Sequence, residues 1–149
     1  MANLLNKLFN VDKKILKKFV AFRLAGRESE VLAGYKPNNG AKSDLASVSE
    51  MVKDSVATTG MFKNISSSFS YDLENISSEM FYQIEQEAEK FSKKCAKYAR
   101  KILDNNWELV ELIANKLIAE GIITGNEVEQ IYKTYMKKQE NKKKWKIPP

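Results

Sequence analysis

The sequence predicts an all-α protein, or nearly so: a helical bundle with one long helix and a C-terminal antiparallel helical hairpin. Apolar residues recur at intervals of three and four through most of the chain, which is the period of an amphipathic helix. Each such stretch is bounded by residues that start or stop helices. The 149 residues contain no β-type alternation of useful length and no internal repeat.

The first predicted helix begins after Asp12, a residue type that caps helix N-termini well, and continues to about Leu32. Its first half is amphipathic. One arc carries Lys13, Lys14, Lys17 and Lys18, and the opposite arc carries Ile15, Leu16, Phe19 and Val20. A basic amphipathic helix can lie on a membrane, but it is more often a surface helix of a globular domain, and we expect the second role here.

A loop and a second helix follow. The segment GYKPNNGAKSDL, residues 34–45, holds two glycines, a proline and two asparagines, and so predicts a loop. The helix after it is expected from Ser43 or Asp44 to Thr58, with Gly60 as its end. Its apolar stripe consists of Leu45, Val48, Val52 and Val56. Residues 61–75 are rich in Ser and Asn and predict an irregular connection, with room for a short strand.

The longest helix is predicted from a cap at Ser77 or Ser78 to about Asp104. Its apolar residues alternate by three and four and form a heptad-like seam. The seam consists of Phe81, Ile84, Ala88, Phe91, Cys95, Tyr98 and Ile102.

Asn105 and Asn106 interrupt this pattern, and a helix over residues 107–120 follows. Its stripe is Leu109, Leu112, Ile113 and Leu117. The short break predicts that this helix and the long one form an antiparallel hairpin. Gly121 is a natural C-terminal cap. Thr124 and Glu127 form a capping box for a last helix to about residue 138.

These elements predict three segments: an N-terminal segment (1–11), a helical domain (12–138) and a basic flexible tail (139–149). The net charge is +6, and six lysines between residues 137 and 146 account for the excess, so we expect the body to carry no net basic charge. No apolar run is long enough to span a membrane. The N-terminus is a poor signal peptide, and the single cysteine fits a reducing compartment, so we expect a cytoplasmic protein.

The composition excludes several kinds of active site. The chain contains no histidine, which excludes a histidine-dependent nucleophile triad and any HExxH zinc site. Cys95 lies on the apolar seam and is expected to be a buried structural thiol. The glycine-rich phosphate-binding pattern is also absent. The sequence therefore predicts no self-sufficient active site.

Three short motifs nevertheless occur in a recognisable order. They are Gly26-Arg27 with Glu30, Gly40-Ala41 with Asp44-Leu45, and Thr59-Gly60-Met61. Further on, residues 99–132 read ARKILDNNWELVELIANKLIAEGIITGNEVEQIY. Together, over about residues 12–135, these segments resemble the C-terminal part of the peptidase domain of FtsH-type AAA+ zinc metalloproteases. The departures from that pattern are Ala25 for Gly, Val31 for Glu, Asn39 for Thr and Ser43 for Asn.

The resemblance implies a metal site that this chain holds only in part. In that family, two histidines of HExxH and one later aspartate bind zinc, and the HExxH glutamate is the general base. Asp44 stands at the aspartate position, and Glu30 lies where it could at most support the ligands. The sequence contains no HExxH, and we expect this chain to lack the ATPase module and the membrane anchor as well. We therefore expect neither bound zinc, the family cofactor, nor peptidase activity from this chain alone.

The sequence leaves three functions open. The first is a truncated or degenerate peptidase-like scaffold, inactive alone, that forms a homo-oligomer or docks on a related full-length protease. The second is the C-terminal half of an ATP-dependent zinc metalloendopeptidase whose HExxH portion is missing from this chain. The third is nucleic-acid binding through the basic tail and Trp145, which we do not expect.

Overall fold

The computed structural model describes residues 11–36 and 38–144, the last four of these through their backbone alone. These residues contain helices and no strand. The helices are α2 (Lys13–Leu32), the short 3₁₀ helix η1 (Asn39–Ala41), α3 (Lys42–Thr58), α4 (Ser78–Asn105), α5 (Trp107–Glu120) and α6 (Gly125–Lys144). The chain divides into two compact units, residues 1–102 and 103–149. The all-α class is confirmed, and the single domain over 12–138 stays a prediction.

The predicted helix starts and stops agree with the backbone. The Asp12 carboxylate accepts the N–H of Ile15 at 2.7 Å and caps α2. Of the two serines proposed before α4, Ser77 is the cap, since its hydroxyl accepts the N–H of Met80 at 3.2 Å. Gly121 ends α5 in the left-handed conformation, with φ at 76°. Local side-chain chemistry therefore determines these boundaries.

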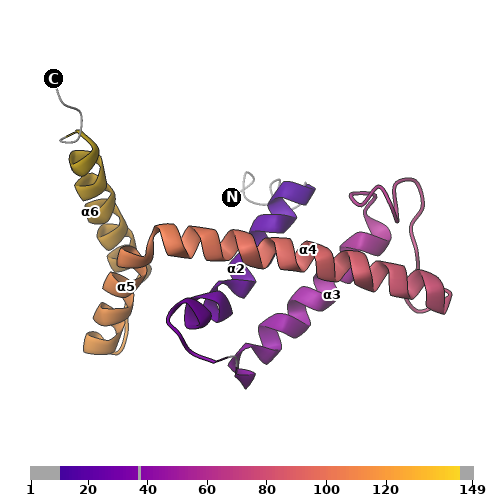
Figure 1. The fold of residues 1–149 in the computed structure, drawn as a ribbon, viewed down its shortest axis with the longest axis horizontal. Coiled ribbons are helices and arrows are strands. Elements are labelled where there is room, and N and C mark those ends of the chain that lie inside the picture. The colour runs from indigo at the N-terminus through magenta and orange to yellow at the C-terminus, as the bar shows by residue number, and fades with distance from the viewer. Residues whose placement is uncertain (1–10, 37, 145–149) are drawn as a thin grey trace. The chain divides into compact units, whose positions relative to one another are not determined.

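The first unit has its core where α2 and α3 meet α4. In Figure 1, α2 and α3 lie on the same side of α4, which crosses both. The buried apolar side chains come from all three helices and from the 61–75 connection: Leu16, Val20, Ala21, Leu24, Val48, Val52, Val56, Ala57, Phe62, Ile84, Ala88, Phe91, Cys95 and Ala99. The Phe62 and Phe91 rings meet edge to face, with centroids 5.2 Å apart. The Lys13 ammonium lies 3.9 Å from the Phe62 centroid.

Five residues assigned to apolar stripes are more exposed than predicted. The exposed fractions are 44% for Phe19, 41% for Leu45, 45% for Ile102, 45% for Leu112 and 43% for Leu117. Leu45 and Ile102 are the first and the last residue of their stripes. The 61–75 connection contains no strand. It is anchored by Phe62 in the core and by the Tyr71 N–H, which donates to the Ala57 carbonyl at 3.0 Å.

The second unit contains a hairpin of α5 and α6. The sequence predicted that the helix over residues 107–120 forms a hairpin with the long helix before it. Within this unit, however, the helix that packs on α5 is α6. The capping box is confirmed: the Thr124 N–H and hydroxyl donate to the Glu127 carboxylate at 2.8 and 2.6 Å. The helix α6 continues to Lys144, past the predicted end at 138. No glycine or proline that would break the helix occurs between residue 138 and Pro148. None of the described helices combines the length and apolar character that crossing a membrane requires.

Candidate functional site

Asp44 lies in the first turn of α3, directly after the loop that joins it to α2. The Asn38 side chain accepts the Gly40 N–H at 2.7 Å and so shapes the start of η1. The Asp44 side chain is 45% exposed, and its carboxylate lies 3.5 Å from the Arg23 guanidinium of α2. This position places a carboxylate at the positive end of the α3 dipole, which stabilises it by roughly 0.3–1 kcal/mol.

Glu30 lies near the end of α2 and faces the same loop. Its carboxylate accepts a hydrogen bond from the Asn38 amide at 3.3 Å. Glu30 and Asp44 therefore border one loop, but they have separate partners: Glu30 bonds to the loop and Asp44 pairs with Arg23. The structure gives Glu30 a role in holding the loop.

The described residues do not fit a catalytic zinc ion. Such a site needs three protein ligands with a fourth position open. The chain has no histidine, and the described residues contain no group of three or more Cys, Asp and Glu side chains that could hold a metal. Asp44 supplies one donor group, and Arg23 competes for it as a cation. No hydrolytic step can be derived from this donor set.

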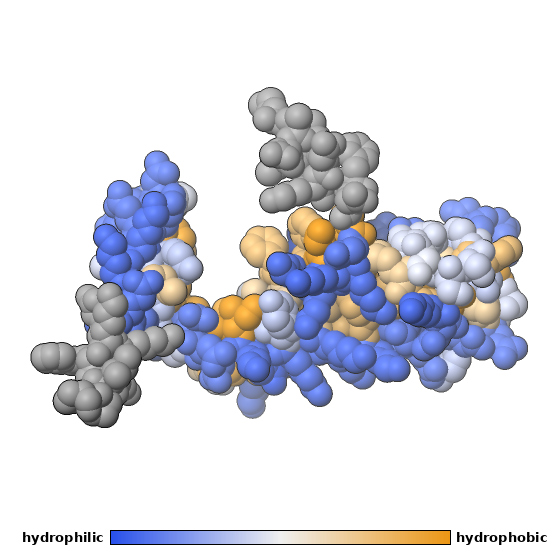
Figure 2. Space-filling model, turned by 90° about the horizontal axis from the view of Figure 1, so that it is seen from above, coloured by the Kyte–Doolittle hydropathy of each residue, from blue (hydrophilic) through white to orange (hydrophobic). Residues whose placement is uncertain are grey.

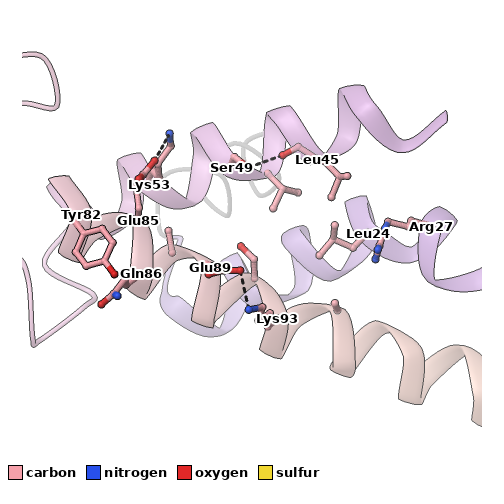
Figure 3. A pocket seen from close by; sticks show the side chains of 14 residues that line it. Leu24, Arg27, Leu45, Ser49, Lys53, Tyr82, Glu85, Gln86, Glu89 and Lys93 are labelled. Atoms are coloured by element: carbon pink, nitrogen blue, oxygen red, sulfur yellow. Dashed lines mark hydrogen bonds and ion pairs between the residues drawn. The ribbon is translucent and has the colours of Figure 1, made fainter. Parts of the chain in front are cut away.

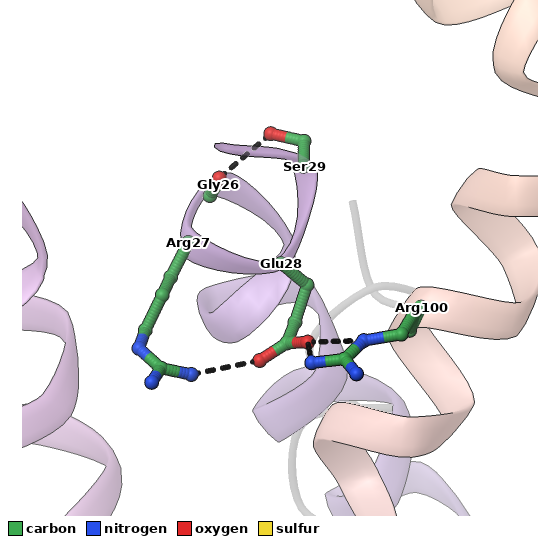
Figure 4. Close-up of polar contacts among 5 residues, drawn as sticks. All are labelled: Gly26, Arg27, Glu28, Ser29 and Arg100. Carbon is green, nitrogen blue, oxygen red and sulfur yellow. Dashed lines mark hydrogen bonds and ion pairs between the residues drawn. The ribbon is translucent and has the colours of Figure 1, made fainter. Parts of the chain in front are cut away.

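A buried ion cluster that the sequence analysis missed joins α2 to α4 (Figure 4). Glu28 is 1% exposed. One of its oxygens accepts from the Arg27 guanidinium at 2.9 Å, and the other accepts from Nε of Arg100 at 2.8 Å and from Nη2 of the same residue. The spacing in the sequence could have indicated that Glu28 is buried. Glu28 continues the run of Leu16, Val20 and Leu24 at intervals of four residues. A carboxylate on a buried stripe requires a cationic partner.

A groove of about 720 Å³ lies between α2, α3 and α4 (Figure 3). Leu24, Val48 and Ala88 contribute apolar surface to it. At its edge, Lys53 pairs with Glu85 at 3.7 Å. Leu45 also lines the groove, so the groove reaches the residue next to Asp44.

The groove offers binding surface. The hydroxyl of Ser49, one of the two serines that line the groove, donates to the Leu45 carbonyl at 2.9 Å. Cys95 is completely buried in the core, and burial raises the pKa of its thiol to about 11. The thiol is therefore protonated at neutral pH and shielded from substrates, as predicted for a structural cysteine.

Comparison with known proteins places the chain in a family. The family model described as peptidase family M41 matches residues 5–131. The chain is 29% identical over 131 residues to the ATP-dependent zinc metalloprotease FtsH 2 of Phytoplasma mali (strain AT), covering 85% of this chain and 18% of that protein. It is 28% identical over 138 residues to FtsH of Mycoplasmopsis pulmonis (strain UAB CTIP), covering 84% and 19%.

A third relative is FtsH 2 of Thermoanaerobacter sp. (strain X514), which is 30% identical over 124 residues, covering 83% of this chain and 24% of that protein. The chain thus spans about a fifth of the length of these curated relatives. No solved structure gives a significant match. Because the family model matches more than half of the chain, the protein belongs to peptidase family M41 and resembles the C-terminal part of an FtsH-type peptidase domain.

Proposed function

We propose that this chain is a helical module of the FtsH peptidase type that does not hydrolyse peptides by itself and acts as a scaffold. It either self-associates or docks on a related full-length protease. One contrast supports the proposal: the three-helix core of the first unit is well packed, whereas the described residues contain no group of three or more side chains that could hold a metal. A packed helical core without such a donor group is suited to binding. The chain has one cysteine and so cannot form a disulfide within itself, which agrees with the reducing, cytoplasmic location that we propose.

The C-terminal hairpin supports an assembly role. Leu117, Ile118 and Ile122 are 43%, 81% and 79% exposed and follow one another along α5 and its end. Exposed apolar side chains at neighbouring positions are candidates for an interaction surface if they form one patch. Size-exclusion chromatography with light scattering should show an oligomer that Ile118→Glu disrupts and Gln130→Glu, an equal charge change on α6, leaves intact. A strictly monomeric protein at high concentration would count against self-association.

A measurement of metal content and a casein cleavage assay test the proposal that the chain alone is inactive. We expect the purified protein to contain no stoichiometric zinc and to leave casein uncut, and we expect Asp44→Ala to change neither result. A stoichiometric zinc that disappears in Asp44→Ala would overturn the proposal.

The alternative is that the chain supplies one half of a zinc peptidase. The position of Asp44 favours it, because a half-exposed carboxylate at the junction of a loop and a helix is accessible to a metal. The printed names of the relatives, ATP-dependent zinc metalloproteases, agree with it. Mixing the chain with a polypeptide that carries HExxH should then give zinc-dependent casein cleavage that Asp44→Ala abolishes. Lack of cleavage in every such mixture rejects the alternative.

A further inference from the structure

The first unit gathers lysines on one face of α4. Lys90, Lys94, Lys97 and Lys101 are spaced by four, three and four residues, so they share one face of the helix. All four are exposed, and this face lies to one side of the stripe that carries the buried Ile84, Ala88 and Cys95. We call these four residues the lysine row. At 1.5 Å per residue it spans about 16 Å.

Most of this charge is not neutralised locally. Lys90 lies 3.7 Å from Glu87, whereas Lys94, Lys97 and Lys101 have no recorded ion pair within the described ranges. A shallow hollow of about 440 Å³ lies between the lysine side chains and is also lined by Gln86, Glu89 and Lys93. Figure 2 shows hydrophilic side chains gathered along α4. Although the net charge of the body is near zero, positive charge is therefore concentrated on one face of α4.

The chemistry of the row selects among anionic partners. A bilayer surface is bound by helices that insert apolar side chains, and the row consists of lysines alone. Protein interfaces are depleted in lysine relative to the rest of the surface. Lysine is, by contrast, a main contributor of phosphate contacts, which dominate nucleic-acid affinity. A helix about 10–12 Å wide also fits a major groove of about 12 Å.

We propose that the lysine row of α4 binds the phosphate backbone of duplex nucleic acid without sequence preference. This goes beyond the scaffold function and places the contact on the folded body, away from the tail considered from the sequence. With three lysines that make no ion pair among the described residues, the expected contact is weak and salt-dependent. The logarithm of the binding constant should fall against the logarithm of salt concentration with a slope of about −2.7.

Fluorescence anisotropy with a short labelled DNA duplex tests the proposal on the full chain. Raising KCl from about 50 to about 200 mM should weaken binding about 40-fold. Lys97→Gln should reduce the slope by about 1. The triple variant Lys94→Gln, Lys97→Gln, Lys101→Gln should lose nearly all binding while keeping its circular dichroism spectrum, because all three side chains are exposed.

Two control variants carry the same change in charge. Lys36→Gln, Lys42→Gln, Lys63→Gln alters exposed lysines elsewhere in the first unit and should bind like the unchanged protein. Lys142→Gln, Lys143→Gln, Lys144→Gln alters the tail and should retain the salt slope. The proposal is overturned if the tail variant loses binding and the row variant does not. It is equally overturned if the protein binds vesicles of phosphatidylcholine and phosphatidylglycerol but not the duplex.

Discussion

Removal of Arg100 should destabilise the protein far more than removal of an equally exposed arginine elsewhere. The Arg100 and Arg23 side chains are both 49% exposed, but the partner of Arg100 is the buried Glu28, whereas Asp44, the partner of Arg23, is 45% exposed. A buried carboxylate that loses a cation keeps its full desolvation cost and loses part of the compensation for it. The comparison of Arg100→Met with Arg23→Met therefore isolates the burial of the partner.

The magnitudes follow from this difference. Arg100→Met should cost about 3 kcal/mol, at the lower end for a broken buried pair, because Arg27 still contacts Glu28. Arg23→Met breaks an exposed pair and should cost about 0–1 kcal/mol. Glu28→Leu should cost less than Arg100→Met, since it removes the buried charge and leaves two partly exposed arginines that water can solvate.

Urea denaturation followed by circular dichroism measures these differences. In thermal unfolding, Arg100→Met should lower Tm by roughly 6–12 °C. In the double variant Glu28→Leu, Arg100→Met, the second change should cost little once the carboxylate is gone, which gives a large coupling energy. The reasoning is refuted if Glu28→Leu is as destabilising as Arg100→Met, or if Arg100→Met and Arg23→Met are equivalent.

Three other predictions concern local structure. Phe62→Ala should cost about 3–5 kcal/mol in urea denaturation, because it empties a core position beside Phe91, and the same change at the 66% exposed Phe69 should cost far less. Gly60→Ala should be more destabilising than Gly121→Ala: both have positive φ, but an added Cβ at Gly60 would meet the Ser66 carbonyl at 3.3 Å, and similar urea midpoints would contradict this. Hydrogen bonds from Thr124, with help from Lys116, lower the pKa of Glu127 from 4.5 to about 2. The contribution of Glu127 to the free energy of unfolding is therefore complete above pH 4.5 and is lost as the pH falls toward 2. Glu127→Gln should flatten that part of the curve of unfolding free energy against pH.

Local chemistry made much of the fold predictable. A cap such as Asp12, or the Thr124–Glu127 pair, acts within three residues, so the sequence contains both partners side by side. The predicted apolar stripe of α3 is confirmed at Val48, Val52 and Val56, which are buried. These positions were predictable because a fixed helical period decides which residues face the core.

The parts that the sequence did not reveal depend on distant partners. Arg100 lies 72 residues from Glu28, and only the crossing of α2 and α4 brings them together. Phe62 lies in an irregular connection, where no period indicates burial, yet it is among the largest fully buried side chains. At the candidate site, the motif identified the position of Asp44, whereas its pairing with Arg23 across 21 residues required the packing of α2 on α3.

The burial of Cys95 makes the protein a convenient substrate for site-directed labelling. Its thiol is the chain's one sulfhydryl, is completely enclosed, and is protonated at the pH of maleimide coupling. A cysteine introduced on the surface would therefore react alone, without removal of the native one. Cysteines introduced by Lys63→Cys and Lys133→Cys would place one probe in each compact unit. The pair of probes would report the distance between the two units and its change when a partner binds.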